Sequence, residues 1–491
     1  MQHRFSMKRR GLVVAAAAVG AVLALAATAL ANVPVKLASV DPFTNTDSYH
    51  KTEVEPDTIS NGTNMFVSTF QMGRHTDGGA SDVGFATSTN AGGTWTDGAL
   101  PGLTIYSTPA GPYQRATDPA VGYDAKHGQW IIVTLDSKAS SGFSGDDITV
   151  SRSADGLTWG SPVTVKAATS FQSFDSTWIA CDGWSASPHY GNCYVEWDDN
   201  GSGNILHLST STDGGLTWHE ATTPGSVVIG GKPLAQPNGN VVVPIDDGFA
   251  SSAESFVSTD GGLNYTGPYS ISSFQIHSPA GGLRGLDIPS ADVDTTGKVY
   301  VTWYDCRFRS GCSSNDIVMS TSTNGQTWTS PVRIPIDPTS STDDHFLAGV
   351  AVQPGTGGST AHLALTYWYY QVANCTSCQL YVGFTSSHDG GATWGAGKQV
   401  GGPYGVTWYP STTSGYMVGD YSSISGVQGG WETVFALAKS SPCTLGANNC
   451  KVTMVAPASP LKGSTATSPV GTHPVTAAGR VSHAGGLISR S

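Results

Sequence analysis

Apolar and polar residues alternate along this chain in short runs, and turns rich in Gly, Asn, Asp and Ser separate the runs. Alternation with a period of two residues is typical of β-strands. Three successive runs recur in the same order: 118–123, 129–135 and 147–151, then 289–294, 298–304 and 316–321, then 348–352, 362–367 and 380–384. The pattern predicts an all-β protein built from repeated small antiparallel sheets.

A short phrase accompanies these units and recurs six times. Its fullest form is Ser211-Thr-Asp-Gly-Gly-Leu-Thr-Trp218, and the other copies occupy 88–95, 153–159, 258–265, 322–328 and 387–394. An Asp or Asn side chain can hydrogen-bond the backbone just ahead of it, Gly supplies a positive φ, and the closing aromatic residue anchors the next strand. Six copies indicate a repeat architecture, in which each unit buries its face against its neighbours.

The phrase resembles the Asp-box of the sialidase (neuraminidase) superfamily, Ser-x-Asp-x-Gly-x-Thr-Trp. The copies at 211–218 and 387–394 match it in full, the first copy has Asn90 in place of Asp, the second and fifth are one residue shorter, and the fourth ends in Asn264 and Tyr265. In that family the Asp-box forms the turn between the third and fourth strands of a β-propeller blade, on the face away from the active site. The resemblance therefore implies an all-β β-propeller of four-stranded antiparallel blades, in which the phrase has a structural role.

Strand patterns continue after the last copy of the phrase, at 420–425, 432–437 and 451–455. These residues would form one further blade without an Asp-box, and the leading residues 33–37 could supply its outer strand and close the ring. That interpretation predicts seven blades. Sialidases have six, so a six-bladed ring is the alternative.

The two ends of the chain differ from the repeats. Four basic residues precede an apolar run from 11 to 30, and Ala29-Leu-Ala31 is a small-residue cleavage site. This arrangement predicts a signal peptide over 1–31 and a secreted, extracellular protein, although a run of this length could also remain as a membrane anchor. We place the propeller over 32–456. Residues 457–491 are rich in Ser, Thr, Pro, Gly and Ala without periodicity, and we expect a disordered tail.

Composition narrows the choice of partners. The formal net charge is −12, only 12% of residues are charged, and no basic run follows the leader. Nucleic acid is therefore not an expected partner. The 13 Trp and 18 Tyr residues suit aromatic-lined surfaces. We expect a monomer whose partner is an extracellular carbohydrate or glycoprotein, with no membrane contact after the signal peptide is cleaved.

The eight cysteines form four close pairs in the sequence. In an exported protein such pairs predict local disulfides that staple loops, although eight cysteines formally allow 105 connectivities. The pairs are Cys181 with Cys193, Cys306 with Cys312, Cys375 with Cys378, and Cys443 with Cys450. The third pair also has the spacing of a redox or zinc element, but no second Cys or His pair accompanies it at ligand spacing.

We expect no metal site and no cofactor. Paired acids at Asp198-Asp199 and Asp246-Asp247 could bind Ca²⁺ through oxygen ligands. No loop matches a calcium-binding pattern, so no sequence motif supports calcium binding.

The resemblance also implies catalytic residues. Sialidases use an arginine cluster for the substrate carboxylate, a Tyr nucleophile with a Glu base, and an Asp acid/base. Gly419-Asp-Tyr421-Ser-Ser423 resembles the phrase that carries the family's nucleophile, and it likewise opens an inner strand after the last Asp-box. Tyr421 is therefore the implied nucleophile, and the alternative is a core tyrosine at the start of a blade. Glu196 is the candidate base, and the acid/base is Asp77 or Asp82, in the loop before the first Asp-box.

The family's first arginine has no counterpart here. Sialidases carry Phe/Tyr-Arg-Ile-Pro on the first inner strand, whereas the corresponding residues 52–60 contain Glu53 and Glu55. The Arg-Ile-Pro at 333–335 follows the fifth Asp-box, on what should be an outer strand, and is a coincidence. Acids near the axis would also disfavour an anionic sugar. An alternative arginine triad could consist of Arg115, Arg284 and Arg307.

Two further groups on loops away from the Asp-box turns are candidates for substrate binding. The loop 305–312, which the predicted Cys306–Cys312 disulfide staples, holds Arg307 and Arg309. Such a disulfide reduces the entropic cost of binding a ligand. Trp368 and Tyr369 belong to an aromatic run that we expect to be exposed.

Three classes of function follow from these features. The first hypothesis is an exo-glycosidase that acts on extracellular glycans, including sialosides, with Tyr421 as nucleophile. The alternative is a non-catalytic propeller that binds glycans or proteins. Glycosidases or lyases that act on neutral or uronic sugars share the fold and form a third class.

Overall fold

The computed structural model describes residues 33–440, 442–446, 449–464 and 467–472. The predicted signal peptide and the last residues of the predicted tail lie outside these ranges. The described residues form strands, turns and four short 3₁₀ segments, namely η1 (Asn200–Ser202), η2 (Ser310–Cys312), η3 (Gly358–Thr360) and η4 (Val406–Trp408). Within these residues, no helix is both long enough and apolar enough to cross a membrane.

Groups of four antiparallel strands repeat along the chain, as the alternation predicts. The first two groups lie in one eight-stranded sheet, where only the pair of Ala80 with Ala116 joins them. One group is β2 (Tyr49–Ser60), β3 (Phe66–Arg74), β4 (Ala80–Ser88) and β5 (Thr96–Ala99). The other is β6 (Arg115–Asp124), β7 (Gln129–Ser137), β8 (Asp147–Ser153) and β9 (Val163–Ala167).

Four more groups are separate sheets, and each keeps its strands in chain order. The first is β10 (Phe174–Cys181), β11 (Cys193–Asp199), β12 (Ile205–Ser211) and β13 (His219–Glu220). The second is β14 (Leu234–Ala235), β15 (Val241–Asp246), β16 (Ser252–Ser258) and β17 (Thr266–Ser273). The third is β18 (Ser290–Val293), β19 (Val299–Asp305), β20 (Asp316–Ser322) and β21 (Val332–Arg333). The fourth is β22 (Asp344–Val352), β23 (Leu363–Tyr370), β24 (Gln379–Ser387) and β26 (Lys398–Gly405).

The remaining strands bring the two ends of the described chain together. They are β1 (Val35–Leu37), β25 (Thr393–Gly395), β27 (Ser411–Thr412), β28 (Gly415–Tyr416), β29 (Ile424–Val427), β30 (Gly430–Thr433), β31 (Phe435–Ala438), β32 (Val452–Pro457) and β33 (Thr467–Pro469). β29 pairs with β30, β31 pairs with β32, and β32 pairs with β1. The expected pairing of 33–37 with the last strands is confirmed for residues 35–37.

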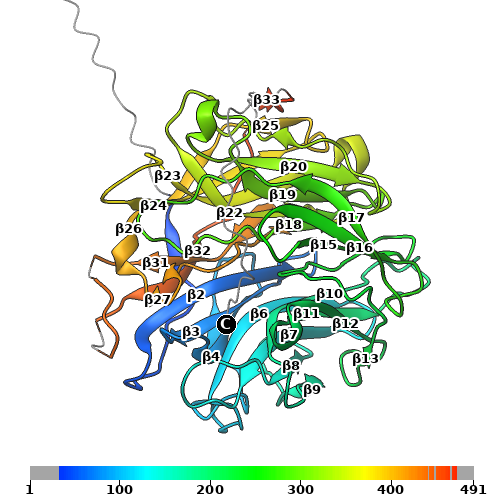
Figure 1. Ribbon diagram of the computed structural model, residues 1–491, viewed down its shortest axis with the longest axis vertical. Coiled ribbons are helices and arrows are strands. Elements are labelled where there is room, and N and C mark those ends of the chain that lie inside the picture. Colours follow the sequence, from blue (N-terminus) through cyan, green and yellow to red (C-terminus); the bar gives the residue numbers. More distant parts are fainter. Residues whose placement is uncertain (1–32, 441, 447–448, 465–466, 473–491) are drawn as a thin grey trace, which may run out of the picture. The chain divides into compact units, whose positions relative to one another are not determined.

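The first strand of each group faces a common axis, which is the arrangement of a β-propeller, as predicted. Figure 1 shows β2, β6, β10, β18 and β22 around the middle, and β9 and β13 near the edge. Apart from the single pair that joins β6 to β4, the innermost strands of the described groups have a strand neighbour on one side only. Their other edges face the axis.

All six copies of the phrase form the turn from the third strand of a group to its outer strand. In the copy at 211–218, Asp213 Oδ1 accepts hydrogen bonds from Ser211 Oγ (2.9 Å) and from the backbone N–H groups of Leu216 and Thr217 (3.0 Å each). Asp213 Oδ2 accepts one from Thr217 Oγ1 (2.6 Å). Gly214 has a φ of 75°, which other residues rarely adopt. The predicted hydrogen bonds and positive φ are both present.

The phrase also fastens neighbouring groups to each other. A glycine carbonyl in the turn accepts a hydrogen bond from a side chain on the third strand of the preceding group. The pairs are Thr87 Oγ1 with Gly156 O (2.5 Å), Arg152 Nε with Gly214 O (2.5 Å), Thr210 Oγ1 with Gly262 O (2.9 Å), and Ser255 Oγ with Gly325 O (2.6 Å). The repeated turn therefore fixes the spacing of the sheets as well as the course of the chain.

Apolar side chains fill the space between neighbouring sheets, so both faces of the second strands are buried. In β7, Ile131 packs into one cluster and Ile132 into another. Both faces of β23 are also buried, since Trp368 and Tyr369 are only 4% and 6% exposed. The prediction that this aromatic run is exposed is wrong, because residues of either parity on a second strand face an adjacent sheet.

Part of the predicted tail pairs with the sheets. Leu461 bridges Trp431 on β30, Gly471 bridges Arg333 on β21, and β33 pairs with β25. These residues supply backbone partners to strand edges, so the described part of 457–472 does not have the expected disorder. The propeller limit placed at 456 is therefore too early.

All four predicted disulfides are present, and all eight cysteines are bridged. Cys181 and Cys193 are register partners at the joined ends of β10 and β11. Cys375 and Cys378 are bonded to each other, which accounts for their spacing without a metal.

Several carboxyl groups are enclosed between the sheets. Asp82, predicted as a loop acid, lies within β4 and is buried, and its Oδ2 accepts a hydrogen bond from Ser107 Oγ (2.6 Å). Burial raises the pKa of Asp82 to about 7, and it raises the pKa values of Asp136 and Glu53 to about 8. The folded protein therefore holds protons that the unfolded chain releases at lower pH.

Replacing Asp213 with Ala should lower the free energy of unfolding by about 1–3 kcal/mol, because the turn loses the acceptor of four hydrogen bonds. Urea unfolding followed by Trp fluorescence measures the change. Asp97→Ala is the control, because Asp97 is exposed on β5 and the described contacts include no hydrogen bond from its side chain. An equal decrease in the free energy of unfolding in the two variants would contradict a stabilising role for the hydrogen bonds of this turn.

The free energy of unfolding should fall as the pH rises from about 4 to about 8. The carboxyl pKa values are raised in the folded state, so the stability that they contribute is present below their unfolded values and is lost as the pH rises through the folded ones. Each such group contributes a slope of up to about 1.4 kcal/mol per pH unit. Urea unfolding at a series of pH values measures the slope. Asp136→Asn should make it shallower, and an unchanged slope would rule out this origin.

Candidate functional site

Four of the inner strands share a bulge partway along their length. The pairing register shifts at this point in β2, β6, β10 and β22. The bulged residues Glu55, Asp118, Ser176 and Leu347 have left-handed φ values of 63°, 46°, 47° and 47°. A left-handed conformation costs a non-glycine residue about 1–2 kcal/mol, and such strain concentrates at functional sites. The repeated bulge marks this level of the axis as the candidate site.

Two guanidinium groups and three carboxyl groups meet at this level. Arg284 forms a two-bond ion pair with Asp420, from Nε to Oδ1 (2.8 Å) and from Nη2 to Oδ2 (2.5 Å). The backbone N–H of Asp420 donates to Glu55 Oε1 (3.3 Å). Gln71 links Glu55 to Arg74. Its Nε2 donates to Glu55 Oε2, and its Oε1 accepts from Arg74 Nη1 (3.0 Å). Strands far apart in the sequence thus share one polar cluster.

Asp118 is the third carboxyl group. Its Oδ1 accepts from Thr117 Oγ1 (3.1 Å), and its Oδ2 accepts from the backbone N–H of Ser176 on the next sheet (3.2 Å). Burial, with the charges of Asp175 and Asp420, raises the pKa of Asp118 to about 7. Burial, with Asp118 and Asp420, holds the pKa of Glu55 well above its usual range. The axial cluster therefore contains proton-bearing carboxyl groups next to an ion-paired one.

A small cavity lies beside the axial cluster. Its volume is about 20 Å³, which is room for about one water molecule. Its lining comprises Glu55, Asp118, Ser176, Thr177, Trp178, Gly230, Gly231, Ile288, Asp420 and Tyr421. The cavity brings carboxyl groups from three inner segments to one water-sized space.

Tyr421 lines this cavity but lacks the surroundings of a nucleophile. Its hydroxyl donates to Pro119 O (2.8 Å), and its ring packs edge-on against Trp178 with centroids 4.9 Å apart. Burial, followed by the charges of Glu55 and Asp118, raises the pKa of Tyr421 well above its usual value. A nucleophilic phenol needs a base on its hydroxyl, whereas here a backbone carbonyl accepts the proton. The contacts fit the alternative reading of a core tyrosine at the start of a blade.

The other predicted catalytic residues form no hydrogen bond with Tyr421 among the described contacts. Glu196 lies in β11, buried against Gly231, and burial raises its pKa well above the usual range. The side chain of Asp77 is 46% exposed and pairs with Arg115 (2.6 Å). Asp82 is enclosed within β4, as described above. The structure therefore does not assemble these four residues into one acid/base site.

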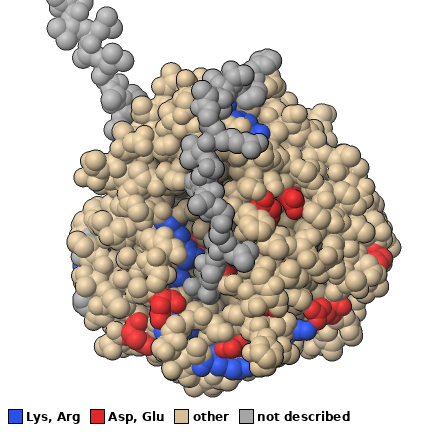
Figure 2. Space-filling model, viewed as in Figure 1, with Lys and Arg blue, Asp and Glu red and all other residues tan. Residues whose placement is uncertain are grey.

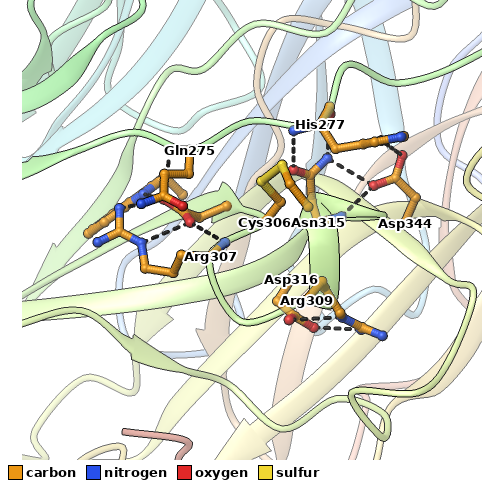
Figure 3. Close-up of a disulfide and its surroundings, with 11 residues drawn as sticks. Gln275, His277, Cys306, Arg307, Arg309, Asn315, Asp316 and Asp344 are labelled. Carbon is orange, nitrogen blue, oxygen red and sulfur yellow. Dashed lines mark hydrogen bonds and ion pairs between the residues drawn. A yellow bond between two sulfur atoms is a disulfide. The ribbon is translucent and has the colours of Figure 1, made fainter. Parts of the chain in front are cut away.

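Each predicted binding arginine is paired with a carboxylate of its own. Arg115 binds Asp77, Arg284 binds Asp420, Arg307 binds Asp305 (2.6 Å), and Arg309 binds Asp316 (2.6 Å). Figure 3 shows Arg307 and Arg309 pointing in different directions from the loop that Cys306 staples. The predicted triad does not converge on one ligand, since only Arg284 belongs to the axial cluster. Arg115 and Arg307 are instead held by Asp77 and Asp305.

A hydrogen-bond network beside the stapled loop fastens three loops together. Asn315 Nδ2 donates to His277 O (2.6 Å) and to Asp344 Oδ1 (2.8 Å), and Asn315 Oδ1 accepts from the His277 backbone N–H (2.8 Å) (Figure 3). His277 Nδ1 lies 3.2 Å from Asp344 Oδ2, and this contact raises the pKa of His277. The network accounts for the acids in this region as structural groups.

Three of the four candidate calcium ligands, Asp199, Asp246 and Asp247, already accept hydrogen bonds. Asp199 accepts from the Ser173 backbone N–H (3.1 Å) and from Ser202 Oγ (2.6 Å), and Asp246 accepts from the Gly248 backbone N–H (2.7 Å). Asp316, Asp337 and His345 come closer to the arrangement of a metal site, because one possible ligand atom of each lies within 4.8 Å of the others. There the guanidinium groups of Arg309 and Arg333 bind both carboxylates, so the group does not fit a cation.

Of the charged residues in the cluster, only Arg284 was predicted as a site residue, and Glu55, Arg74, Asp118 and Asp420 were not. A usable signal is the acid–proline pair, which occurs as Glu55-Pro56 and Asp118-Pro119 at matching points of the first two inner strands. Much of the charge lies inside the molecule. On the face shown in Figure 2, charged side chains are sparse, and the two signs lie side by side near the lower rim.

No family model matches the chain, and no curated protein matches its sequence. Solved structures similar to this chain include sialidases and trans-sialidases. One is the Hadza microbial sialidase Hz136, with TM-score 0.47 and 15% identity over 69% of this chain and 66% of that chain. Another is Trypanosoma rangeli sialidase in complex with sialic acid, with TM-score 0.46 and 14% identity over 72% of this chain and 57% of that chain. A third is a Dyadobacter fermentans protein of unknown function, with TM-score 0.45 and 17% identity over 72% of this chain and 99% of that chain. The chain spans less than two thirds of the length of the two sialidases.

Proposed function

We propose that this chain is a secreted seven-bladed propeller with glycoside hydrolase activity, in which carboxyl groups at the axis act as acid and base. The observation that carries the proposal is the cluster of Glu55, Asp118 and Asp420 with Arg74 and Arg284, gathered at strained bulges around a water-sized cavity. Paired carboxyl groups with separated pKa values are the chemical requirement for hydrolysis of a glycosidic bond.

The count of seven blades is supported by the lining of the axis. Seven inner segments contribute to one channel there, at 57–62, 121–125, 178–184, 232–235, 290–293, 350–354 and 422–426. The last of these leads into β29 and β30, and β31, β32 and β1 continue outward from them. A seventh blade would thus be made from both ends of the described chain.

In the proposed reaction, Asp118 is the proton donor and Asp420 is the charged partner. Asp118 lines the cavity and has a pKa raised to about 7 by burial, so it carries a proton at mildly acidic pH. Arg284 holds both oxygens of Asp420, which orients this carboxylate toward the same cavity. Asp118 donates its proton to the leaving oxygen as the glycosidic bond breaks. Asp420 takes a proton from the water that attacks the anomeric carbon, which yields the free sugar and the alcohol.

The balance of charge favours a neutral sugar over a sialoside. The cluster holds three carboxyl groups and two guanidinium groups, and the guanidinium group of Arg284 already forms an ion pair with Asp420. A substrate carboxylate would therefore face Glu55 and Asp118 without a free arginine cluster. We propose neutral extracellular glycans as the substrates, with sialosides as the alternative that the resemblance implies.

Access to the axial cluster would require a loop to move. Tyr416 O accepts a hydrogen bond from the Arg284 backbone N–H (2.8 Å), and the Thr413 backbone N–H donates to Thr76 O (3.0 Å). These contacts tie the loop that precedes Asp420 to two neighbouring loops. We propose that the residues from Ser411 to Tyr416 swing away to admit a sugar ring.

Secretion and a monomeric state belong to the same proposal. Four disulfides fit an oxidising compartment. The proposed partner is an extracellular glycan or glycoprotein, without nucleic acid or a membrane.

The purified protein should release the fluorophore from at least one neutral 4-methylumbelliferyl glycoside. Asp118→Asn and Asp420→Asn should each lower kcat/KM by about 10²–10⁴-fold, because each removes a proton-transfer or charged group. Asp97→Asn on the exposed strand β5 is the matched control and should retain full activity. Activity should also decline above about pH 7, where Asp118 loses its proton. Turnover that Asp118→Asn and Asp420→Asn leave unchanged would refute the assignment.

Tyr421→Phe separates this proposal from the sialidase mechanism. Its hydroxyl donates to Pro119 O and to no catalytic base among the described residues, so the variant should keep activity within about threefold on a neutral glycoside. A sialoside-specific activity that Tyr421→Phe abolishes would instead support the Tyr nucleophile.

The second candidate is a non-catalytic glycan-binding propeller, and the small cavity favours it. A space of about 20 Å³ does not admit a sugar ring without movement. Binding on a glycan array without turnover of any glycoside would support this candidate.

A further inference from the structure

A second, larger cavity lies along the axis on the side of the phrase turns. Its volume is about 400 Å³, and the later parts of the inner segments line it. The copy of the phrase at 88–95 lies at this end, because the Ala91 backbone N–H donates to Asn64 O in the loop after β2 (2.8 Å). This space, the axial channel, has the volume of a small-molecule site.

A layer of three side chains separates the axial channel from the polar cluster. Lys232 Nζ lies 3.7 Å from the centroid of the Trp178 ring and 5.7 Å from that of Tyr421. Trp178 and Tyr421 also line the small cavity on the other side of the layer. Trp178 and Lys232 line the channel, so Lys232 is a cation at its inner end.

Lys232 is buried without a hydrogen-bond acceptor. The residue is 4% exposed, and among the described contacts its Nζ donates no hydrogen bond to a protein oxygen. An ammonium group carries three donors, and a buried charged donor without an acceptor destabilises the protein. Its contact with the Trp178 ring satisfies the charge only in part. The channel beside it has room for an acceptor from outside the chain.

The two carboxyl groups that line the channel each accept a backbone hydrogen bond already. Asp57 Oδ2 accepts from the Val121 backbone N–H (2.9 Å), and Asp292 Oδ2 accepts from the Val352 backbone N–H (2.7 Å). Burial lowers the pKa of Lys232 to about 8, and the charge of Asp57 opposes this shift, so the ammonium form persists at neutral pH. The same acids would repel a dianion, so one negative charge suits the site better than two.

We propose that the axial channel binds a small organic monoanion, whose carboxylate accepts hydrogen bonds from Lys232 Nζ. Its apolar body would lie against the apolar lining, which includes Leu234, Val350 and Ile424. The proposal is independent of hydrolysis at the axial cluster, because it uses other residues on the other side of the Trp178 layer.

Calorimetric titration of the full chain with cyclohexanecarboxylate and with cyclohexanecarboxamide tests the proposal. The two probes share shape and differ in charge, so the carboxylate should bind at least about tenfold more tightly. Lys232→Met should remove that preference. Lys298→Met is the matched control, because Lys298 also lies over an aromatic ring, with Nζ 4.7 Å from the Tyr300 centroid, but does not line the channel. Equal binding of the two probes, or a preference that survives Lys232→Met, would overturn the proposal.

A second measurement serves if Lys232→Met fails to fold. Brief acetylation followed by peptide mass spectrometry reports the reactivity of each lysine in the unaltered protein. Cyclohexanecarboxylate should slow acetylation of Lys232 by at least about threefold and leave Lys298 unchanged, whereas the amide should protect neither. Failure of the carboxylate to protect Lys232 would overturn the proposal, whatever the glycoside assays show.

Discussion

Apart from one bridging pair on β6, the innermost strands of the described groups have one edge without a strand partner, and the fold depends on how these edges are satisfied at the axis. An unpaired edge presents backbone N–H groups that need acceptors when they are buried. Side chains from the neighbouring sheet provide them: Asp57 accepts from Val121, Asp118 from Ser176, and Asp292 from Val352. The acids of the axis therefore hold neighbouring sheets together before any other role is considered.

This constraint also creates the unusual chemistry of the axis. A carboxyl group that serves an inner edge is enclosed, and burial raises the pKa values of Asp57 and Asp292 to about 6 and that of Asp118 to about 7. Where the strands also bulge, Glu55 and Asp118 meet Asp420 and the arginines that offset the charge. Trp178, Tyr421 and Lys232 form a layer across the axis. The polar cluster with its carboxyl groups lies on one side of the layer, and the channel with the Lys232 ammonium group lies on the other.

Much of the architecture could be predicted because it rests on local signals. The turn at 211–218 is encoded by one acid, two glycines and a hydroxyl within eight residues, and its hydrogen bonds are made inside the same segment. Disulfides between cysteines close in sequence follow for the same reason. The exposure of Trp368 and Tyr369 was predicted wrongly because alternation shows that a strand has two faces, whereas only the neighbouring sheets determine that both faces are covered.

Local patterns in the sequence specify the strands, the six turns, the four disulfides and the pairing of the chain's first strand with its last ones, since each leaves a short-range pattern or a strand without another partner. Which charges meet depends on the fold as a whole. Arg284 and Asp420 stand 136 residues apart, and nothing local to either residue indicates that they form an ion pair. Closure of the ring brings such groups to one axis, and there their burial, rather than their residue type, determines what they can do.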